Sequence, residues 1–185
     1  MPMSSPTPRE SIVPSEIKRI FEGKVFTVQI ETLQLPKGSE MKAEIVRHPG
    51  SVVIIPVTDA GDIILVRQYR PAIAQLAWEL PAGTRKHGED PRKAAARECQ
   101  EEIGLIPDHL ESLGAFFPTP GYCDEQMHFY RVSGLRPPTS RDEPAYQDED
   151  EDIEARAFSP ADVRRMIAAG EVIDLKTVAG LALLG

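Results

Sequence analysis

Three glutamates, Glu98, Glu101 and Glu102, are spaced so that an α-helix would carry their carboxylates on one face. At about 100° per residue, with Glu98 set at zero, Glu102 lies at about 40° and Glu101 at about 300°. Carboxylates at this spacing repel one another and destabilise an isolated helix. A divalent cation removes the repulsion, and oxygen ligands suit Mg²⁺ or Mn²⁺ better than Zn²⁺. The spacing predicts a metal site; the alternative is a solvated acidic face.

The acidic face is expected to border the buried face of the same helix. Ala95, Ala96, Cys99 and Ile103 fall between about 60° and about 160° on the same wheel and form an apolar stripe. Carboxylates beside a buried stripe are themselves partly buried, which raises at least one pKa. A bound cation then relieves both the repulsion and the cost of burial.

The flanking residues set the limits of this helix. Asp90 is a suitable N-cap, Pro91 fits the first helical position, and Gly104 fits the C-terminal stop. The sequence therefore predicts a helix from about Asp90 to Ile103.

A longer motif surrounds the helix. It reads Gly83, five residues, Glu89, seven residues, then Arg97-Glu98-Cys99-Gln100-Glu101-Glu102-Ile103-Gly104-Leu105. This stretch resembles a complete Nudix box, with Cys99 at a position that is usually aliphatic. Cysteine packs as a small hydrophobe, so the departure is slight. A match at seven fixed positions is a specific signal, and the wider likeness covers about residues 20 to 180.

The resemblance implies an α/β fold, a Nudix-type α/β/α sandwich with a mixed central sheet and an N-terminal β-hairpin region. It implies a loop–helix–loop in which Glu98 and Glu102 bind metal and also serve catalysis. Glu101 and the backbone carbonyl of Ala82 are further metal ligands in such proteins, for two or three Mg²⁺ or Mn²⁺ ions. The box residues with a structural role are Gly83, Glu89, Arg97 and Gly104.

The segments around the box are similar to those of ADP-ribose pyrophosphatases. Pro120 stands 16 residues beyond Gly104. Arg70 and Glu79 are candidate substrate-binding residues, since a guanidinium can fork onto a phosphate. An acidic run, residues 147–153, lies where this subfamily carries a mobile catalytic loop. We align Glu149 with its general base and take Glu151 as the alternative.

The resemblance implies hydrolysis of ADP-ribose to AMP and ribose 5-phosphate by in-line attack of water. One alternative is a pyrophosphatase for another nucleoside diphosphate sugar, such as GDP-mannose. The other is a non-catalytic module that senses ADP-ribose. The intact box favours an enzyme, because sensing modules of this kind usually carry an eroded box.

Three regions are expected along the chain. Residues 1–15 contain four prolines among small polar residues and are predicted to form a disordered tail. Residues 16–48 are predicted to form a β region; the resemblance implies that this region makes a homodimer and supplies a residue such as Phe26 to stack on the adenine. Residues 49–185 are predicted to form the Nudix hydrolase domain, with strands near 51–57, 63–69, 113–117, 126–132 and 153–158 and helices beginning at Ser159-Pro160 and near Leu175.

Composition limits the remaining possibilities. The net charge of −8 and the pI of about 5.1 argue against a general nucleic-acid binder. Two cysteines are too few for a disulfide framework. The chain begins without a signal-peptide pattern, and its longest apolar run is too short to span a bilayer. We therefore expect a cytoplasmic protein whose partner is a small nucleoside diphosphate sugar, with no nucleic acid or membrane involved.

Overall fold

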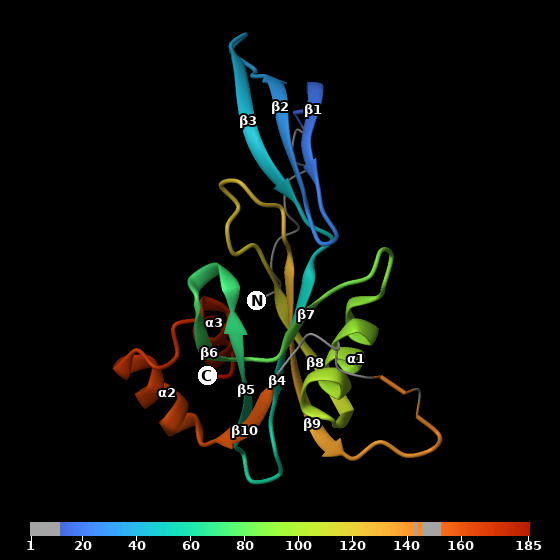
Figure 1. Cartoon of the computed structure of the whole chain (residues 1–185), viewed down its shortest axis with the longest axis vertical. Helices are drawn as coiled ribbons and strands as arrows, with labels where there is room; N and C mark the ends of the chain where they lie inside the picture. The colour runs from blue at the N-terminus through green and yellow to red at the C-terminus, as the bar shows by residue number, and fades with distance from the viewer. Residues whose placement is uncertain (1–11, 143, 146–152) are drawn as a thin grey trace, which may run out of the picture. The chain divides into compact units, whose positions relative to one another are not determined.

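The computed structural model describes residues 12–142, 144–145 and 153–185. Within these ranges the chain forms three sheets and three α-helices (Figure 1). Two compact units are present. Unit 1 extends to His48 and also includes Thr119–Asp124; unit 2 comprises Pro49–Pro118 and Glu125–Gly185.

Unit 1 is built on an antiparallel sheet of β1 (Pro14–Glu22), β2 (Thr27–Gln34) and β3 (Glu40–Arg47). The sequence predicted a β region over residues 16–48, but it marked no separate strand at β1. Its side chains are almost all exposed, so neither of its faces shows the alternation by which a half-buried strand is found in a sequence. The first two residues of β1 fall in the predicted tail, and residues 1–11 lie outside the described part.

Unit 2 contains two sheets. The first has the order β7-β4-β9-β8 and is mixed, because β4 and β9 are parallel whereas the other neighbours are antiparallel. The second has the order β10-β5-β6 and is antiparallel. The strands are β4 (Ser51–Pro56), β5 (Ile63–Arg70), β6 (Gln75–Glu79), β7 (Ala82–Thr84), β8 (Ile106–Phe116), β9 (Met127–Arg136) and β10 (Glu154–Phe158).

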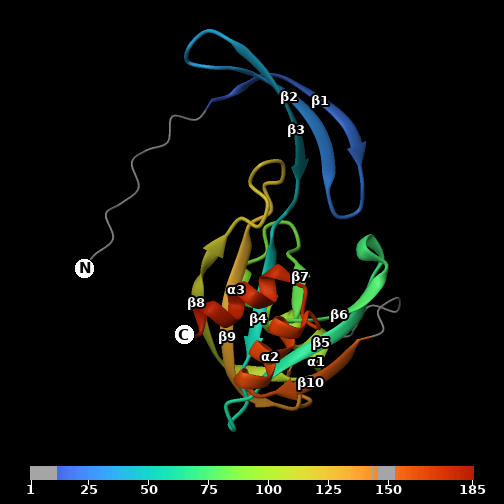
Figure 2. The same cartoon turned by 90° about the vertical axis from the view of Figure 1, so that its left-hand side faces the viewer.

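Strand β4 is apolar without interruption because both of its faces are buried. Val52 and Ile54 point to one core, which they share with α1 (Pro91–Ile103). Val53 and Ile55 point to the other core, which includes residues of β5, α2 and α3. Helices thus cover opposite sides of the strands, as Figures 1 and 2 show. The predicted α/β/α arrangement with a mixed sheet is confirmed.

Helix α1 begins and ends where its local capping signals predicted, and α2 and α3 begin where helix starts were predicted. Asp90 accepts hydrogen bonds from the backbone N–H groups of Arg92 and Lys93 at the start of α1, and Gly104 ends that helix in the left-handed region at φ 69°. Ser159 caps α2 (Pro160–Ala169) in the same way. Asp174 caps α3 (Leu175–Leu183) by accepting from Thr177.

Strands β8 and β9 are longer than predicted. The sequence indicated strands at 113–117 and 126–132. In the structure the two strands pair from Phe116 and Met127 to Ile106 and Arg136. The ladder therefore continues through Gly134, beyond the predicted end of the second strand. None of the helices in the described part of the chain has the length and apolarity needed to cross a bilayer.

Candidate active site

Gly83 brings the beginning of the motif into contact with α1 because it has no side chain. A Cβ atom at this position would lie 2.0 Å from the carboxyl carbon of Glu98, far inside van der Waals contact. The backbone of Gly83 does not adopt a positive φ. The glycine is therefore required for close approach of β7 to α1 and not for a turn.

The two outer acids of the motif are buried. Glu98 is 7% exposed and Glu102 8% exposed, among Ala94, Ala95 and Cys99 on the buried face of α1. The sequence placed these carboxylates beside the buried face; the structure places them within it. The carboxylates are buried because strand β7 lies against this face of the helix. The backbone N–H of Ala82 in that strand lies 3.3 Å from Oε2 of Glu102, so polar backbone atoms contact the buried acid.

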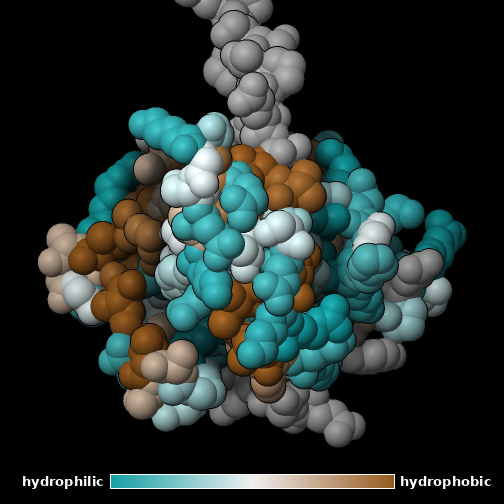
Figure 3. All heavy atoms as spheres, turned by 90° about the horizontal axis from the view of Figure 1, so that it is seen from above, coloured by the Kyte–Doolittle hydropathy of each residue, from teal (hydrophilic) through white to brown (hydrophobic). Residues whose placement is uncertain are grey.

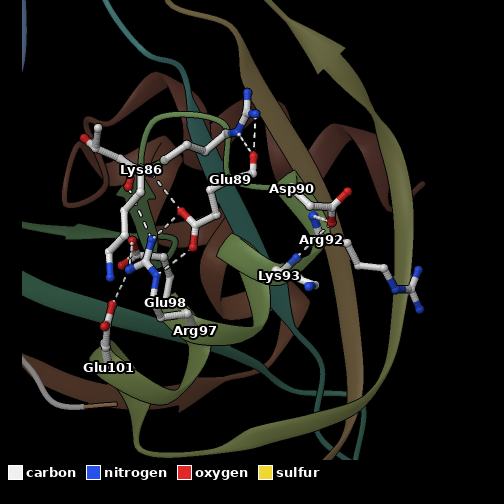
Figure 4. A network of polar contacts seen from close by, with 10 residues as sticks. Lys86, Glu89, Asp90, Arg92, Lys93, Arg97, Glu98 and Glu101 are labelled. Carbon is white, nitrogen blue, oxygen red and sulfur yellow. Dashed lines mark hydrogen bonds and ion pairs between the residues drawn. The ribbon is translucent and has the colours of Figure 1, made fainter. Parts of the chain in front are cut away.

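Arg97 joins three carboxylates (Figure 4). Its Nη1 donates to Oε1 of Glu98 at 2.6 Å and to Oε2 of Glu101 at 2.5 Å. Its Nε and Nη2 both donate to Glu89, each at 3.0 Å. The predicted Glu89–Arg97 pair is present, and it forms one part of a larger network. A guanidinium, with several fixed donors, can serve three acids at once.

Glu89 also holds the loop that precedes α1. Its carboxylate accepts from the backbone N–H of Lys86 at 2.8 Å, and its backbone carbonyl accepts from Nη2 of Arg85 at 2.6 Å. Arg97 lowers the pKa of Glu89, chiefly through their hydrogen bonds, and Lys86 adds to the effect. Glu89 therefore stays ionised and ties the loop to the helix.

Burial raises the pKa of Glu98 to about 7; Arg97 opposes this rise, and Glu101 adds to it. Burial also raises the pKa of the Cys99 thiol to about 12, and the charge of Glu102 contributes. Cys99 is thus a packing residue with a protonated thiol. Glu98, by contrast, loses its proton near neutral pH, as the binding of a cation would require.

The donors at this site fit a hard divalent cation. Glu98 and Glu102 are buried against the backbone of β7, and Gly83 leaves the space that the Glu98 carboxyl group fills. All of these donors are oxygens, which is the set that Mg²⁺ or Mn²⁺ prefers. Within the described ranges no three acidic, histidine or cysteine side chains are already gathered as a metal site. Here the Arg97 guanidinium bridges Glu98 and Glu101.

Arg70 and Glu79, predicted separately as substrate-binding residues, bind each other. Glu79 is 2% exposed and accepts from Nε of Arg70 at 2.7 Å and from Nη2 at 2.9 Å. Burial lowers the pKa of Arg70, but hydrogen bonds and attraction from Glu79 outweigh it, so the pKa is raised. Both residues line an open cavity of about 350 Å³. Arg70 therefore stays protonated and presents a positive charge to that cavity.

The remaining predicted residues lie either in unit 1 or outside the described residues. Phe26 and Pro120 belong to unit 1, and Phe26 is 42% exposed. Glu149 and Glu151 lie outside the described residues.

Three polar residues at the site were missed by sequence reasoning: Arg85, Asp174 and Lys176. Asp174 offered a signal, since it is an N-cap immediately before the predicted C-terminal helix. No local pattern marks Arg85 or Lys176, which are recognised only by their contacts with Glu89 and Glu79.

Comparison with known proteins identifies the fold and the motif together. The NUDIX domain family matches residues 47–179, well over half of this chain of 185 residues. The chain belongs to the Nudix family. The matched range contains the whole motif from Gly83 to Gly104, so the sequence-based recognition is confirmed.

The alignments of this Nudix protein with its relatives cover most of both chains. An ADP-ribose pyrophosphatase of Bacillus subtilis (strain 168) is 38% identical over 160 residues, covering 86% of this chain and 85% of that protein. A methanol dehydrogenase activator of Bacillus methanolicus is 37% identical over 161 residues, covering 87% and 85%. The crystal structure of an ADP compounds hydrolase superposes with a TM-score of 0.79 at 22% identity, covering 95% of this chain and 92% of that one.

The close contact at Gly83 predicts a large effect of a small substitution. In Gly83→Ala the new methyl group overlaps the Glu98 carboxyl group, so the acid must leave its place. We expect the thermal stabilisation of this Nudix protein by Mn²⁺ to be lost. Gly121→Ala is the matched control, because a Cβ there has nothing within 4 Å and the stabilisation should persist. An unchanged Mn²⁺ response in Gly83→Ala would show that Glu98 does not need this position.

The raised pKa of Glu98 predicts how the metal response depends on pH. The folded state holds this proton more tightly than the unfolded state does, so the metal-free protein loses stability as pH rises from 4.5 to about 7. A cation must displace the proton, so Mn²⁺ should raise the melting temperature more at about pH 8 than at about pH 6. The difference should shrink in Glu98→Gln, and an equal or larger shift at the lower pH would contradict the assignment.

Proposed function

We propose that this Nudix protein is an ADP-ribose pyrophosphatase that cleaves ADP-ribose to AMP and ribose 5-phosphate. One observation carries the proposal: Glu98 and Glu102 are buried against β7, where Gly83 makes room for them. Burial of two carboxylates in this way is unfavourable unless cations bind them. The match to the Bacillus subtilis ADP-ribose pyrophosphatase over 86% of the chain supports the choice of substrate.

The metal site in this proposal consists of oxygen donors. Glu98 and Glu102 would bind the divalent cations, with Glu101 and the backbone carbonyl of Ala82 as further ligands. When bound, Mg²⁺ or Mn²⁺ neutralises the pyrophosphate and polarises its phosphorus. We propose two or three ions, in keeping with the family resemblance. Arg97 holds Glu89, Glu98 and Glu101 in place and so keeps the ligands together.

Other side chains supply binding and proton transfer. Nε and Nη2 of Arg70 are bonded to Glu79, which leaves Nη1 to donate to a phosphate oxygen of the substrate. A glutamate of the acidic run removes the proton from the attacking water. Glu149 is the proposed base and Glu151 the alternative. Phe26 and Pro120 are proposed to contact the nucleoside part of the substrate.

Two other functions predict different products. A pyrophosphatase for another nucleoside diphosphate sugar would use the same helix but would prefer a substrate such as GDP-mannose. A sensing module would bind ADP-ribose without turnover. Every fixed position of the box is present, and Arg97 contacts three of its acids. This favours an enzyme over a sensor.

Product analysis tests the substrate and the site together. The purified protein is incubated with ADP-ribose, GDP-mannose, other sugar nucleotides and dinucleotides, each with Mg²⁺ or Mn²⁺. We expect AMP and ribose 5-phosphate from ADP-ribose at the highest kcat/KM. Glu98→Gln and Glu102→Gln should each lower kcat by several orders of magnitude, because an amide cannot replace an anionic ligand.

Matched measurements separate loss of chemistry from loss of fold. Both glutamine variants should keep the wild-type circular dichroism spectrum and unfold cooperatively, since the side-chain volume is nearly conserved. Glu111→Gln, on an exposed side chain of β8, is the surface control and should match wild-type turnover. Near-normal turnover in both site variants would refute the metal-ligand role, and preference for another sugar nucleotide would refute the substrate.

We also propose that the protein is a homodimer formed through the sheet of unit 1, and that it acts in the cytoplasm. The sheet carries exposed apolar side chains, including Ile17 at 57%, Ile20 at 53% and Phe21 at 51%. Apolar side chains of the molecular surface are brown in Figure 3. Apolar groups in such number on one small sheet favour association.

Sedimentation velocity tests the dimer. We expect the wild type to sediment as a dimer and the double variant Ile17→Glu, Phe21→Glu to sediment as a monomer, because charges cannot be buried without partners. Leu76→Glu in unit 2, at a side chain that is 52% exposed, is the control and should remain dimeric. A monomeric wild type, or a dimer that only Leu76→Glu disrupts, would overturn the proposal.

A further inference from the structure

A buried ionic cluster connects the C-terminal helix α3 to Arg70. Lys176 donates from Nζ to Oε2 of Glu79 and lies 3.1 Å from Oδ1 of Asp174. The Lys176 side chain is 8% exposed and that of Glu79 2% exposed. Charges at such depth are retained only when each has a partner of opposite sign. The cluster thus pairs two cations, Arg70 and Lys176, with two anions, Glu79 and Asp174.

The two oxygens of Glu79 are held from two directions. Oε1 accepts from Nε of Arg70, whereas Oε2 accepts from Nη2 of Arg70 and from Lys176. A carboxylate held only by a bidentate arginine can move together with that arginine. The third bond, from a lysine on another element, fixes the plane of the carboxylate and with it the plane of the guanidinium.

Lys176 is in turn fixed by the start of α3. Asp174 accepts from the backbone N–H of Thr177 at 2.9 Å and from its Oγ1 at 2.6 Å, and Oγ1 also accepts from the backbone N–H of Leu80 at 2.8 Å. A Cβ on Gly180 would lie 2.4 Å from Cδ1 of Leu80. Helix α3 is therefore in direct contact with the segment that connects Glu79 to Ala82.

The cluster faces a cavity. Arg70, Glu79, Asp174 and Lys176 line the open cavity of about 350 Å³, with Ile73 and Ile173 among its apolar walls. Nη1 of Arg70 has no hydrogen-bond partner in the described part of the chain. Nη1 of Arg70 therefore remains available to donate to a phosphate oxygen, and the direction in which it points determines how well a phosphate is held.

We propose that Lys176 is a positioning residue that orients Arg70 toward the substrate phosphate by holding Glu79 from the opposite side. The inference rests on the proposed function for the identity of the substrate, but the Lys176–Glu79–Arg70 connection is a property of the fold alone. Lys176 itself does not touch the reacting atoms.

Steady-state kinetics with ADP-ribose and Mg²⁺ test the consequence. Arg70 binds a phosphate in both the ground state and the transition state, so a misplaced guanidinium weakens both alike. We expect Lys176→Met to raise KM about tenfold or more while kcat stays within about threefold of the wild type. Lys176→Arg keeps the charge and should return KM to within about threefold. Arg165→Met, on a 73% exposed side chain of α2, is the surface control and should leave both constants unchanged.

A spectroscopic measurement on the protein without substrate tests the connection itself. The Nε–H signal of Arg70 in a ¹H–¹⁵N spectrum is assigned by its absence in Arg70→Lys. We expect a sharp, slowly exchanging signal in the wild type and in Lys176→Arg, and a broadened or rapidly exchanging signal in Lys176→Met. An unchanged signal together with an unchanged KM in Lys176→Met overturns the proposal.

The two measurements also separate this inference from the proposed function. A wild type that hydrolyses no ADP-ribose refutes the proposed function, and the Arg70 signal then still decides whether Lys176 orients Arg70. If Lys176→Met does not fold, the double variant Lys176→Met, Asp174→Asn removes one charge of each sign, keeps the Arg70–Glu79 pair and leaves a residue that can cap α3. Restored folding with a mobile Arg70 signal supports the proposal, whereas a rigid Arg70 signal in that double variant overturns it.

Discussion

Burial of two carboxylates on one helix is the constraint on which the rest of the site depends. Glu98 and Glu102 are each less than 10% exposed, and an ionised group at such depth is destabilising unless a cation or a dipole compensates it. Two features of the protein provide that compensation: the backbone N–H of Ala82 approaches Glu102, and the Arg97 guanidinium donates to Glu98. Gly83 contributes space, because the absence of a side chain there lets the Glu98 carboxyl group fit. These residues together thus make the burial of the two carboxylates possible.

The parts of the structure that could be predicted from the sequence are those decided by local physics. The limits of α1 depend on Asp90, Pro91 and Gly104, all adjacent to the helix, and the structure has the helix there. Strand β4 was recognised because burial on both faces makes it apolar throughout. The grouping of the three glutamates on one face of α1 was predicted for the same reason, since helical geometry places residues three and four apart together wherever the helix lies.

The parts that could not be predicted depend on residues distant in the sequence. The helical wheel placed Glu98 beside the buried face, whereas the approach of β7 places it within that face. Arg70 and Glu79 were recognised one by one, but their bidentate bond requires β5 and β6 to pair in the register that sets Val66 opposite Glu79. Lys176 is separated from Glu79 by 97 residues, so no spacing rule connects them. Strand β1, exposed along its length, carries no burial pattern at all.

Two ionic clusters in this protein share one arrangement with the charges reversed: a central group of one sign binds several groups of the other sign. Around Arg97 one cation serves Glu89, Glu98 and Glu101; around Glu79 one carboxylate serves Arg70 and Lys176. In each cluster the central group has more partners than a simple ion pair offers, so the loss of one partner changes the charge felt by all the others. Energies of substitution within either cluster should therefore not add. The segment from Glu79 to Gly83 connects the clusters, with α1 against its end and α3 against its beginning. The acids that we propose to bind cations and the arginine that we propose to bind phosphate thus contact the two ends of one short segment.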